Sequence, residues 1–218
     1  MPCAVYFRPV RSWLAMLCVI AVASVARADD VKRPFSDAEK TKLAAGQLVT
    51  RQAREEKNGL RLIGGASWQL VKASPDTVFR ALLDTPRYDR MLPTVSRAQL
   101  ISEQPTLRRV KLEHKKGPLG VSYRIALIID HARRDITFKL NDRLESGVRA
   151  AWGYLTVTPW GTDKSLLSYG VMADPGDGLL VGLVRDVIQE WLLRVPEQVR
   201  KHVESATGRA LYGQLSRK

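Results

Sequence analysis

Apolar and polar residues alternate along two segments in the middle of the chain, residues 107–115 and 135–141. Such a period of two is typical of a β-strand with one buried face and one wet face. The apolar positions of this pattern are Val110, Leu112, Ile136, Phe138 and Leu140. His114 falls on the same side as Val110 and Leu112, so alternation places it on the buried face.

Six strand-like segments follow one another through the second half of the chain: 95–102, 107–115, 119–131, 135–141, 150–158 and 165–173. The short connections between them predict antiparallel neighbours. Two earlier segments, 47–55 and 60–72, are joined at Asn58-Gly59, a dipeptide that tolerates the positive φ angles of a tight hairpin turn. The chain therefore predicts about seven or eight antiparallel strands.

Short helices precede the main run of strands. Ser36 and Glu39 form a capping box that starts the first one. Residues 74–92 indicate a pair of short helices that begins at the N-cap residue Ser74 and is broken at Pro86.

A long amphipathic helix is predicted at the C-terminal end. Its apolar stripe recurs in steps of three and four residues through Leu180, Val184, Val187, Ile188, Trp191, Val195, Val199 and Val203. We expect Pro196 to kink this helix and Gly208 to end it, with a basic tail over residues 209–218.

One helix cannot cover so wide a sheet. Seven or eight strands span about 35 Å, whereas a helix with its side chains is about 10–12 Å across. We therefore predict an α+β fold in which a curved antiparallel sheet wraps around the C-terminal helix and leaves an apolar internal chamber. The residues expected to line it and bind a ligand are Trp68, Phe79, Leu112, His114, Tyr123, Ile125, Leu127, Phe138, Leu155, Tyr169, Val184, Ile188 and Trp191.

Residues 1–28 have the pattern of a secretory signal peptide. Arg8 and Arg11 precede an apolar stretch over residues 13–25, and Ala26-Arg27-Ala28 fits an A-x-A cleavage site. We expect cleavage after Ala28 and a periplasmic or secreted protein, with an uncleaved N-terminal anchor as the alternative. The stretch is short for a membrane span, which needs about 20 residues.

The rest of the chain reads as one domain. Residues 29–59 form an extension with a helix and a strand, residues 60–208 the main domain, and residues 209–218 the tail. Both cysteines, Cys3 and Cys18, lie in the predicted signal peptide, so we expect no disulfide in the mature protein.

The chain is strongly basic. Of its +13 net charge, three units belong to Arg8, Arg11 and Arg27, which leaves +10 for the mature protein. Export argues against nucleic acid as a partner, and the basic residues are scattered. We favour a solvated basic surface, with transient docking to an anionic membrane as the alternative.

Few residues suggest catalysis or metal binding. His114 has two interpretations: an inner-face group that bonds a ligand or transfers a proton, or a solvent-facing residue at the strand end beside Lys115-Lys116, which we favour. Tyr123 and Tyr169 would either orient a ligand or satisfy their hydroxyls at the sheet edge.

We expect no metal and no cofactor. The three histidines, His114, His131 and His202, are not at metal-ligand spacing. Asp174 and Asp177 lack the spaced oxygen ligands of a calcium loop, and a turn with a helix cap is favoured.

Two segments also carry a family resemblance. VKASPDTVFRALLDTPRYDRMLP at residues 71–93 and GYLTVTPWGTDKSLLSYGVMADP at residues 153–175 resemble the polyketide cyclase and lipid transport group of the START/SRPBCC superfamily. This superfamily has the helix-grip fold of the birch pollen allergen, and the group includes coenzyme Q-binding proteins. The resemblance covers about residues 60–205. It implies a single-domain binder of hydrophobic ligands such as isoprenoid quinones, sterols or acyl chains, without an obligatory cofactor.

The sequence therefore favours an exported, non-enzymatic binding or transfer protein for a lipid, isoprenoid or polyketide-like ligand. One alternative is an enzyme of the cyclase or dehydratase kind, with His114 or a tyrosine as its proton-transfer group. Another is an envelope module that docks to a membrane or a protein through its basic face.

Overall fold

A single antiparallel sheet of eight strands dominates the structure, a computed structural model that describes residues 33–116, 119–141, 147–176 and 179–213. The strand order across the sheet is β1-β2-β8-β7-β6-β5-β4-β3. The strands are β1 (Val49–Lys57), β2 (Leu60–Val71), β3 (Val95–Gln104), β4 (Leu107–Lys116), β5 (Leu119–Asp130), β6 (Asp135–Leu140), β7 (Ala150–Pro159) and β8 (Ser165–Asp174).

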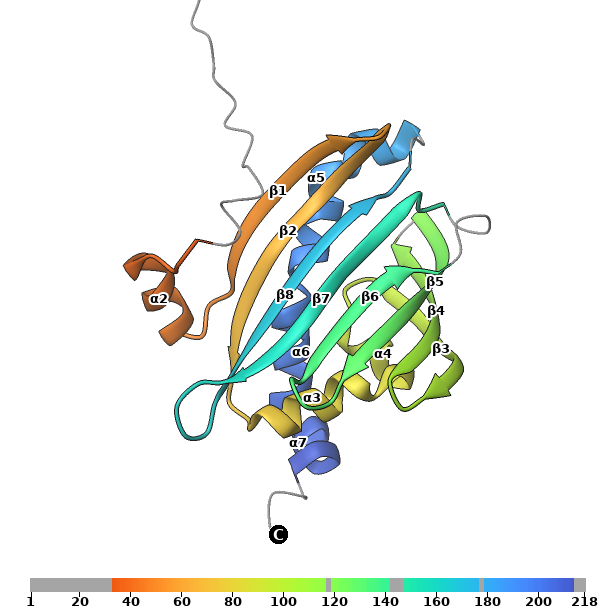
Figure 1. The fold of residues 1–218 in the computed structure, drawn as a ribbon. Helices are drawn as coiled ribbons and strands as arrows, with labels where there is room; N and C mark the ends of the chain where they lie inside the picture. Colours follow the sequence, from red (N-terminus) through yellow and green to blue (C-terminus); the bar gives the residue numbers. More distant parts are fainter. Residues whose placement is uncertain (1–32, 117–118, 142–146, 177–178, 214–218) are drawn as a thin grey trace, which may run out of the picture.

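The helices lie mainly on one side of this sheet. Figure 1 shows α5 and α6 running behind β2, β8 and β7, with α3, α4 and α7 gathered at one end. None of the described helices is long and apolar enough to cross a membrane. The helices are α2 (Asp37–Ala44), α3 (Pro75–Leu83), the 3-10 helix η1 (Thr85–Arg87), α4 (Tyr88–Met91), α5 (Leu179–Leu193), α6 (Val195–Glu204) and α7 (Ala206–Tyr212).

The predicted α+β helix-grip fold is confirmed. Every predicted strand is present, with both ends within two residues of their expected positions. Asn58 and Gly59 have φ angles of 51° and 73°, as a tight hairpin turn requires. Ser36 and Glu39 form the predicted capping box, and Ser74 accepts a hydrogen bond from the backbone N–H of Thr77.

The C-terminal helix differs from the prediction, because it is divided into three. The chain breaks at Arg194, whose ψ of 0° leaves the helical range just before Pro196 enters the first turn of α6. A second break follows at Ser205, which N-caps α7 by accepting from the backbone N–H of Gly208. Gly208 therefore lies inside a new helix rather than at a helix end, and α7 occupies the start of the predicted tail.

The outer face of the sheet is partly covered by α2. Leu43 of this helix packs with Val49, Ala66, Trp68 and Leu70 in a core separate from the main one. Phe35 lies edge-on to the Trp68 ring at 5.3 Å, and the Arg51 guanidinium lies 4.9 Å from the same ring. β2 is therefore buried on both faces.

A polar contact ties α5 to the sheet. The buried amide of Gln189 donates to the carbonyl oxygens of Ala53 at 3.0 Å and Gly64 at 2.8 Å, and accepts from the Arg54 Nε at 2.9 Å. Gly64 and Gly65 have φ angles of 155° and 132°, and a Cβ on Gly64 would lie 1.9 Å from the Val171 carbonyl oxygen. Only glycine fits at these two positions of β2.

The two edges of the sheet are β1 and β3. β1 pairs with β2 along its whole length. The β3–β4 pair is interrupted by register shifts between Val95 and Arg97 and between Leu100 and Ser102. β3 is therefore an irregular edge strand.

Candidate functional site

The hollow side of the sheet encloses a cavity of about 330 Å³. Its walls come from β4 to β8, and residues of α3, α4, α5 and α6 close it. The volume lies at the lower end of the range for pockets that hold small organic ligands, about 300–1,000 Å³. The described lining residues are Leu82, Tyr88, Met91, Leu92, Pro93, Thr94, Leu112, His114, Gly120, Val121, Tyr123, Ile125, Leu127, Phe138, Gly147, Val148, Ala151, Leu155, Tyr169, Val171, Ala173, Pro175, Ile188, Trp191, Leu192, Val195 and Val199.

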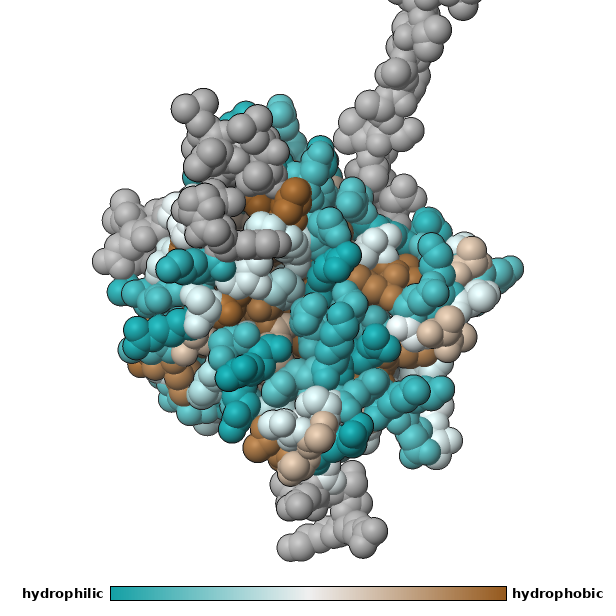
Figure 2. Space-filling model, turned by 180° about the vertical axis from the view of Figure 1, so that it is seen from behind, coloured by the Kyte–Doolittle hydropathy of each residue, from teal (hydrophilic) through white to brown (hydrophobic). Residues whose placement is uncertain are grey.

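Strand alternation explains the apolar character of this lining. Every second residue of a strand faces the same side, and the inward sets are Tyr123, Ile125 and Leu127 on β5 and Tyr169, Val171 and Ala173 on β8. The surface differs: the face in Figure 2, seen from behind, is mostly hydrophilic with scattered hydrophobic patches. The cavity is thus an apolar space inside a strongly basic protein.

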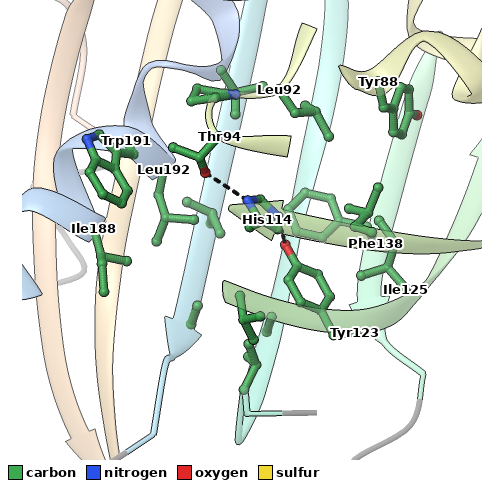
Figure 3. Close-up of a pocket in the computed structure, with 18 of the residues that line it drawn as sticks. Tyr88, Leu92, Thr94, His114, Tyr123, Ile125, Phe138, Ile188, Trp191 and Leu192 are labelled. Carbon is green, nitrogen blue, oxygen red and sulfur yellow. Dashed lines mark hydrogen bonds between the residues drawn. The ribbon is translucent and has the colours of Figure 1, made fainter. Parts of the chain in front are cut away.

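Three polar side chains form a hydrogen-bonded chain in the cavity wall (Figure 3). The Thr94 Oγ1 lies 2.9 Å from the His114 Nδ1, and the His114 Nε2 lies 2.8 Å from the Tyr123 hydroxyl oxygen. The His114 and Tyr123 rings stack, with centroids 5.3 Å apart and planes inclined by 15°. His114 therefore faces the cavity, and the solvent-facing orientation favoured from its neighbouring lysines is wrong.

The Thr94 backbone is held in an unusual conformation. Its φ is 64°, in the left-handed region that β-branched residues avoid at a cost of about 1–3 kcal/mol. The Thr94 carbonyl accepts from the Lys115 N–H at 3.0 Å, which joins this residue to β4 next to His114. A strained residue that the surrounding structure retains is typical of functional sites.

Burial keeps these polar groups uncharged at neutral pH. Desolvation lowers the pKa of His114 to about 4, although a hydrogen bond to the Pro93 backbone opposes this. Desolvation also raises the pKa of Tyr123 and of Tyr169. All three side chains are therefore neutral hydrogen-bonding groups near pH 7.

The other two cavity tyrosines differ in their hydrogen bonding. The Tyr88 hydroxyl donates to the Leu82 carbonyl oxygen at 2.7 Å. Tyr169 stacks on Phe138 with centroids 5.9 Å apart, and its hydroxyl has no hydrogen-bond partner among the described residues. Of the cavity tyrosines, only Tyr169 thus presents a hydroxyl whose bonding within the described structure is entirely unused.

Most residues predicted to line the chamber do line this cavity. They are Leu112, His114, Tyr123, Ile125, Leu127, Phe138, Leu155, Tyr169, Ile188 and Trp191. The Val184 side chain lies outside the described residues.

Trp68 and Phe79 do not line the cavity, contrary to expectation. Trp68 points to the outer face of β2, where α2 and Phe35 cover it. Phe79 lies in the main core and meets the His131 ring edge-on at 5.9 Å, and it is Leu82 of the same helix that reaches the cavity.

Several lining residues were missed by sequence reasoning. The most important is Thr94, which lies in the short link between α4 and β3. Hydrophobic periodicity identifies residues within helices and strands, so it could not indicate a residue in a short connection such as Thr94. Met91 and Leu92, also missed, are apolar residues of the predicted helix pair, and this could have indicated them.

Among the described residues, metal-ligating side chains do not gather near the cavity. Within the described ranges, no group of three or more histidine, cysteine, aspartate or glutamate side chains could hold a metal ion. Asp174 accepts from the backbone N–H groups of Arg61 at 3.0 Å and Gly176 at 2.9 Å. Its carboxylate thus holds the turn after β8, and Asp177 lies outside the described residues.

The sequence of this chain matches a known protein family. A family model described as polyketide cyclase/dehydrase and lipid transport matches residues 68–205. Comparison with curated protein sequences gives no match.

Similar solved structures include a STAR-related lipid transfer protein from Xanthomonas axonopodis, with a TM-score of 0.55 and 17% identity over 72% of this chain and 99% of that chain. A protein from Thermus thermophilus has a TM-score of 0.54 and 15% identity, over 62% and 90%. The Zhui aromatase/cyclase from Streptomyces has a TM-score of 0.50 and 16% identity, over 73% and 99%. At these identities the likeness shows a common fold.

Proposed function

Because the chain belongs to the polyketide cyclase/dehydrase and lipid transport family, we propose that it binds a hydrophobic small molecule in its internal cavity and carries it without chemical change. The family suggests either hydrophobic ligand binding with lipid transport or cyclase chemistry. The carrier role is the function that the composition of the cavity supports best.

The apolar lining of the cavity is the observation that carries this proposal. A water molecule in a protein interior needs two to four polar partners, and most of this wall offers none. An apolar ligand needs no such partners and removes its own surface from water, at about 25 cal/mol per Å². The cavity is therefore better suited to a hydrocarbon-rich ligand than to water.

The polar groups of the cavity support the role of a ligand carrier rather than that of an enzyme. The described lining residues include no carboxylate, lysine or cysteine, the side chains that most often act with histidine as acid, base or nucleophile. Thr94, His114 and Tyr123 form hydrogen bonds with one another, so each has a hydrogen-bond partner without a substrate.

Native mass spectrometry of gently purified protein, followed by solvent extraction, tests this function. We expect a bound hydrophobic small molecule in wild type. An Ala151→Phe variant fills part of the cavity and should lose it, whereas Thr158→Phe, an exposed position on the same strand, should keep it. Equal ligand content in the two variants would contradict binding in this cavity.

We also propose that the carrier works outside the cytoplasm. The basic residues, apolar stretch and A-x-A site within residues 1–28 support this proposal. Cell fractionation with N-terminal sequencing should find a protein that begins at Asp29 in the periplasm or medium. A full-length N-terminus in the cytoplasmic fraction would contradict it.

The +10 charge of the mature protein supports transient contact with an anionic membrane during ligand exchange. Sedimentation with vesicles should increase with anionic lipid content and decrease with salt. Sedimentation that responds to neither would contradict this contact.

A cyclase or dehydratase activity is the second candidate, favoured by the neutral His114 next to Tyr123 in the cavity. A neutral imidazole could accept a proton from a bound substrate. If the protein is such an enzyme, His114→Phe should abolish conversion of a polyketide-like substrate but retain its binding. Unchanged conversion in this variant would exclude His114 as the base.

A further inference from the structure

The described lining of the cavity holds no charged group. None of its residues is aspartate, glutamate, lysine or arginine. His114, the only titratable side chain in this described lining besides the tyrosines, is neutral near pH 7 because burial lowers its pKa to about 4. A carboxylate or phosphate that entered would lose its hydration without meeting an opposite charge, at a cost of several kcal/mol. The cavity wall therefore disfavours charged ligands.

Two tyrosine hydroxyls remain able to bond a ligand. Tyr169 is only 5% exposed, and its hydroxyl finds no partner among the described residues. Tyr169 lines the cavity, so a ligand oxygen there can form a hydrogen bond with this hydroxyl and gain about 0.5–1.5 kcal/mol. The Tyr123 hydroxyl bonds His114, and a hydroxyl can make further bonds because it has one donor and two acceptor sites.

The His114 tautomer decides what Tyr123 offers. With the proton on Nε2, His114 donates to the Tyr123 oxygen, accepts from the Thr94 hydroxyl at Nδ1, and leaves the Tyr123 O–H free to donate. With the proton on Nδ1, the Tyr123 O–H donates to Nε2, and the Tyr123 lone pairs are left to accept. The chain from Thr94 to Tyr123 can thus present either a donor or an acceptor to the cavity.

We propose that the ligand is an uncharged, hydrocarbon-rich molecule with a carbonyl or hydroxyl oxygen, held by the hydroxyls of Tyr123 and Tyr169. A carbonyl oxygen can accept from either tyrosine, and a ligand hydroxyl can also donate to Tyr123 in the second tautomer. This inference rests on the proposed binding function and adds the chemical class of the ligand.

The rest of such a ligand would meet mainly apolar surface. Figure 3 shows Ile188, Trp191 and Leu192 of α5 across the cavity from His114 and Tyr123. Ile125 and Phe138 extend the apolar wall beyond Tyr123. The oxygen-binding groups therefore lie in one wall of a space that is otherwise suited to hydrocarbon.

Equilibrium dialysis of delipidated protein against four probes of equal chain length tests the proposal. The probes are a twelve-carbon methyl ketone, primary alcohol, carboxylate and alkane, measured near pH 7.5 by gas chromatography. In wild type we expect the ketone and the alcohol to bind more tightly than the carboxylate and the alkane.

The variants Tyr169→Phe and Tyr123→Phe remove only an oxygen atom. Each should weaken binding of the ketone by about 3- to 10-fold, the value of one neutral hydrogen bond, and leave alkane binding unchanged. Tyr154→Phe, on the exposed face of β7 and away from the cavity, is the matched control and should bind all four probes as wild type does.

Three results would overturn the proposal. If the carboxylate binds as tightly as the ketone, the ligand need not be uncharged. If both tyrosine variants keep the preference for the ketone over the alkane, these hydroxyls do not bind the oxygen. In both cases the binding function stands, whereas failure of all four probes to bind would reject that function together with the ligand class.

Discussion

The His114 Nε2 lies 2.8 Å from the Tyr123 hydroxyl oxygen, and the two residues come from the neighbouring antiparallel strands β4 and β5. Leu112 is the direct partner of Tyr123 across the β4–β5 ladder, and His114 is the partner of Val121, so the two residues are diagonal neighbours on the inner face. Long side chains reach each other at this spacing. The sheet therefore places a neutral polar pair inside an otherwise apolar cavity.

The buried His114 should make stability depend on pH. Its pKa is about 4 in the folded protein and 6.5 in the unfolded chain, so between these values the unfolded chain binds more protons. Stability should therefore fall as the pH is lowered from 6.5 towards 4, by at most about 3 kcal/mol.

Urea unfolding from pH 7 to 4.5 measures this effect, and the difference between wild type and His114→Phe isolates it. The comparison is necessary because burial also lowers the pKa of His202. His114→Phe should show a much smaller loss of stability than wild type across this range. A parallel loss in both proteins would show that His114 does not titrate as its burial predicts.

Gly153→Ala should destabilise the protein and disturb the cavity. An added Cβ would lie 2.1 Å from the Gly170 carbonyl oxygen and 2.4 Å from the Phe138 ring. Because the carbonyl belongs to the neighbouring strand, relief requires a backbone shift, and overpacking of this kind costs about 1–3 kcal/mol. Thermal unfolding measures the loss.

Gly120→Ala is the control for this substitution, since the nearest atom to its new Cβ would be 3.8 Å away. Its melting temperature should stay close to that of wild type. Equal destabilisation by the two substitutions would mean that chain flexibility, rather than the close approach of the Gly170 carbonyl oxygen and the Phe138 ring, determines the need for glycine at position 153.

Gln189→Leu should detach α5 from the sheet. The substitution leaves the carbonyl oxygens of Ala53 and Gly64 without their donor. We expect a loss of about 2–3 kcal/mol in the free energy of unfolding, because two buried acceptors become unsatisfied. Hydrogen exchange should become faster in α5 before it does so in the central strands.

Glu190→Gln provides the comparison one residue further along α5. Glu190 forms an ion pair with Arg194 in which both side chains are about half exposed, so its loss should cost less than about 0.5 kcal/mol. A similar cost for the two variants would show that the buried amide of Gln189 contributes nothing beyond a surface contact.

Glu39 should make the attachment of α2 sensitive to acid. Hydrogen bonds from Arg51 lower the pKa of Glu39 to about 2 from 4.5. The carboxylate thus stabilises the folded state above pH 4.5, and this stabilisation is lost as the pH falls towards 2. Trp68 fluorescence reports the change, because Arg51 lies over its ring.

Glu39→Gln should produce the same fluorescence change at neutral pH and remove the acid-dependent step. Asp37→Asn, in the same helix but 98% exposed at the side chain, should leave both unchanged. A Trp68 signal that is unaffected by Glu39→Gln would show that Arg51 is held by its other contacts alone.

Local signals in the sequence were sufficient for most of the fold. Strand ends coincide with turn residues, and the caps at Ser36 and Ser74 depend only on residues within one helical turn. The breaks at Arg194 and Ser205 were harder to predict. The apolar stripe continues across Arg194, so periodicity alone indicates one helix there. The stripe ends at Val203, and periodicity therefore says nothing about a further helix after Ser205.

The site was predicted where alternation applies and missed where it does not. Along β4 and β6 polar and apolar residues alternate, so period two identifies the inward residues Leu112, His114 and Phe138. β2 is buried on both faces because α2 covers its outer side, and nothing local indicates which way Trp68 points. The bond between Thr94 and His114 depends on how a link residue meets a strand, which is a tertiary contact without a local signal.

The open edges of the sheet bear on how the protein behaves at high concentration. An exposed edge strand is a template for pairing with a second molecule, the first step of aggregation. β1 meets this risk with charged residues, among them Arg54, Glu55, Glu56 and Lys57. On β3 the register shifts near Arg97 and Ser102 would spoil an intermolecular ladder. Both edges are thus protected against edge-to-edge polymerisation, which allows the sheet to remain open and curved.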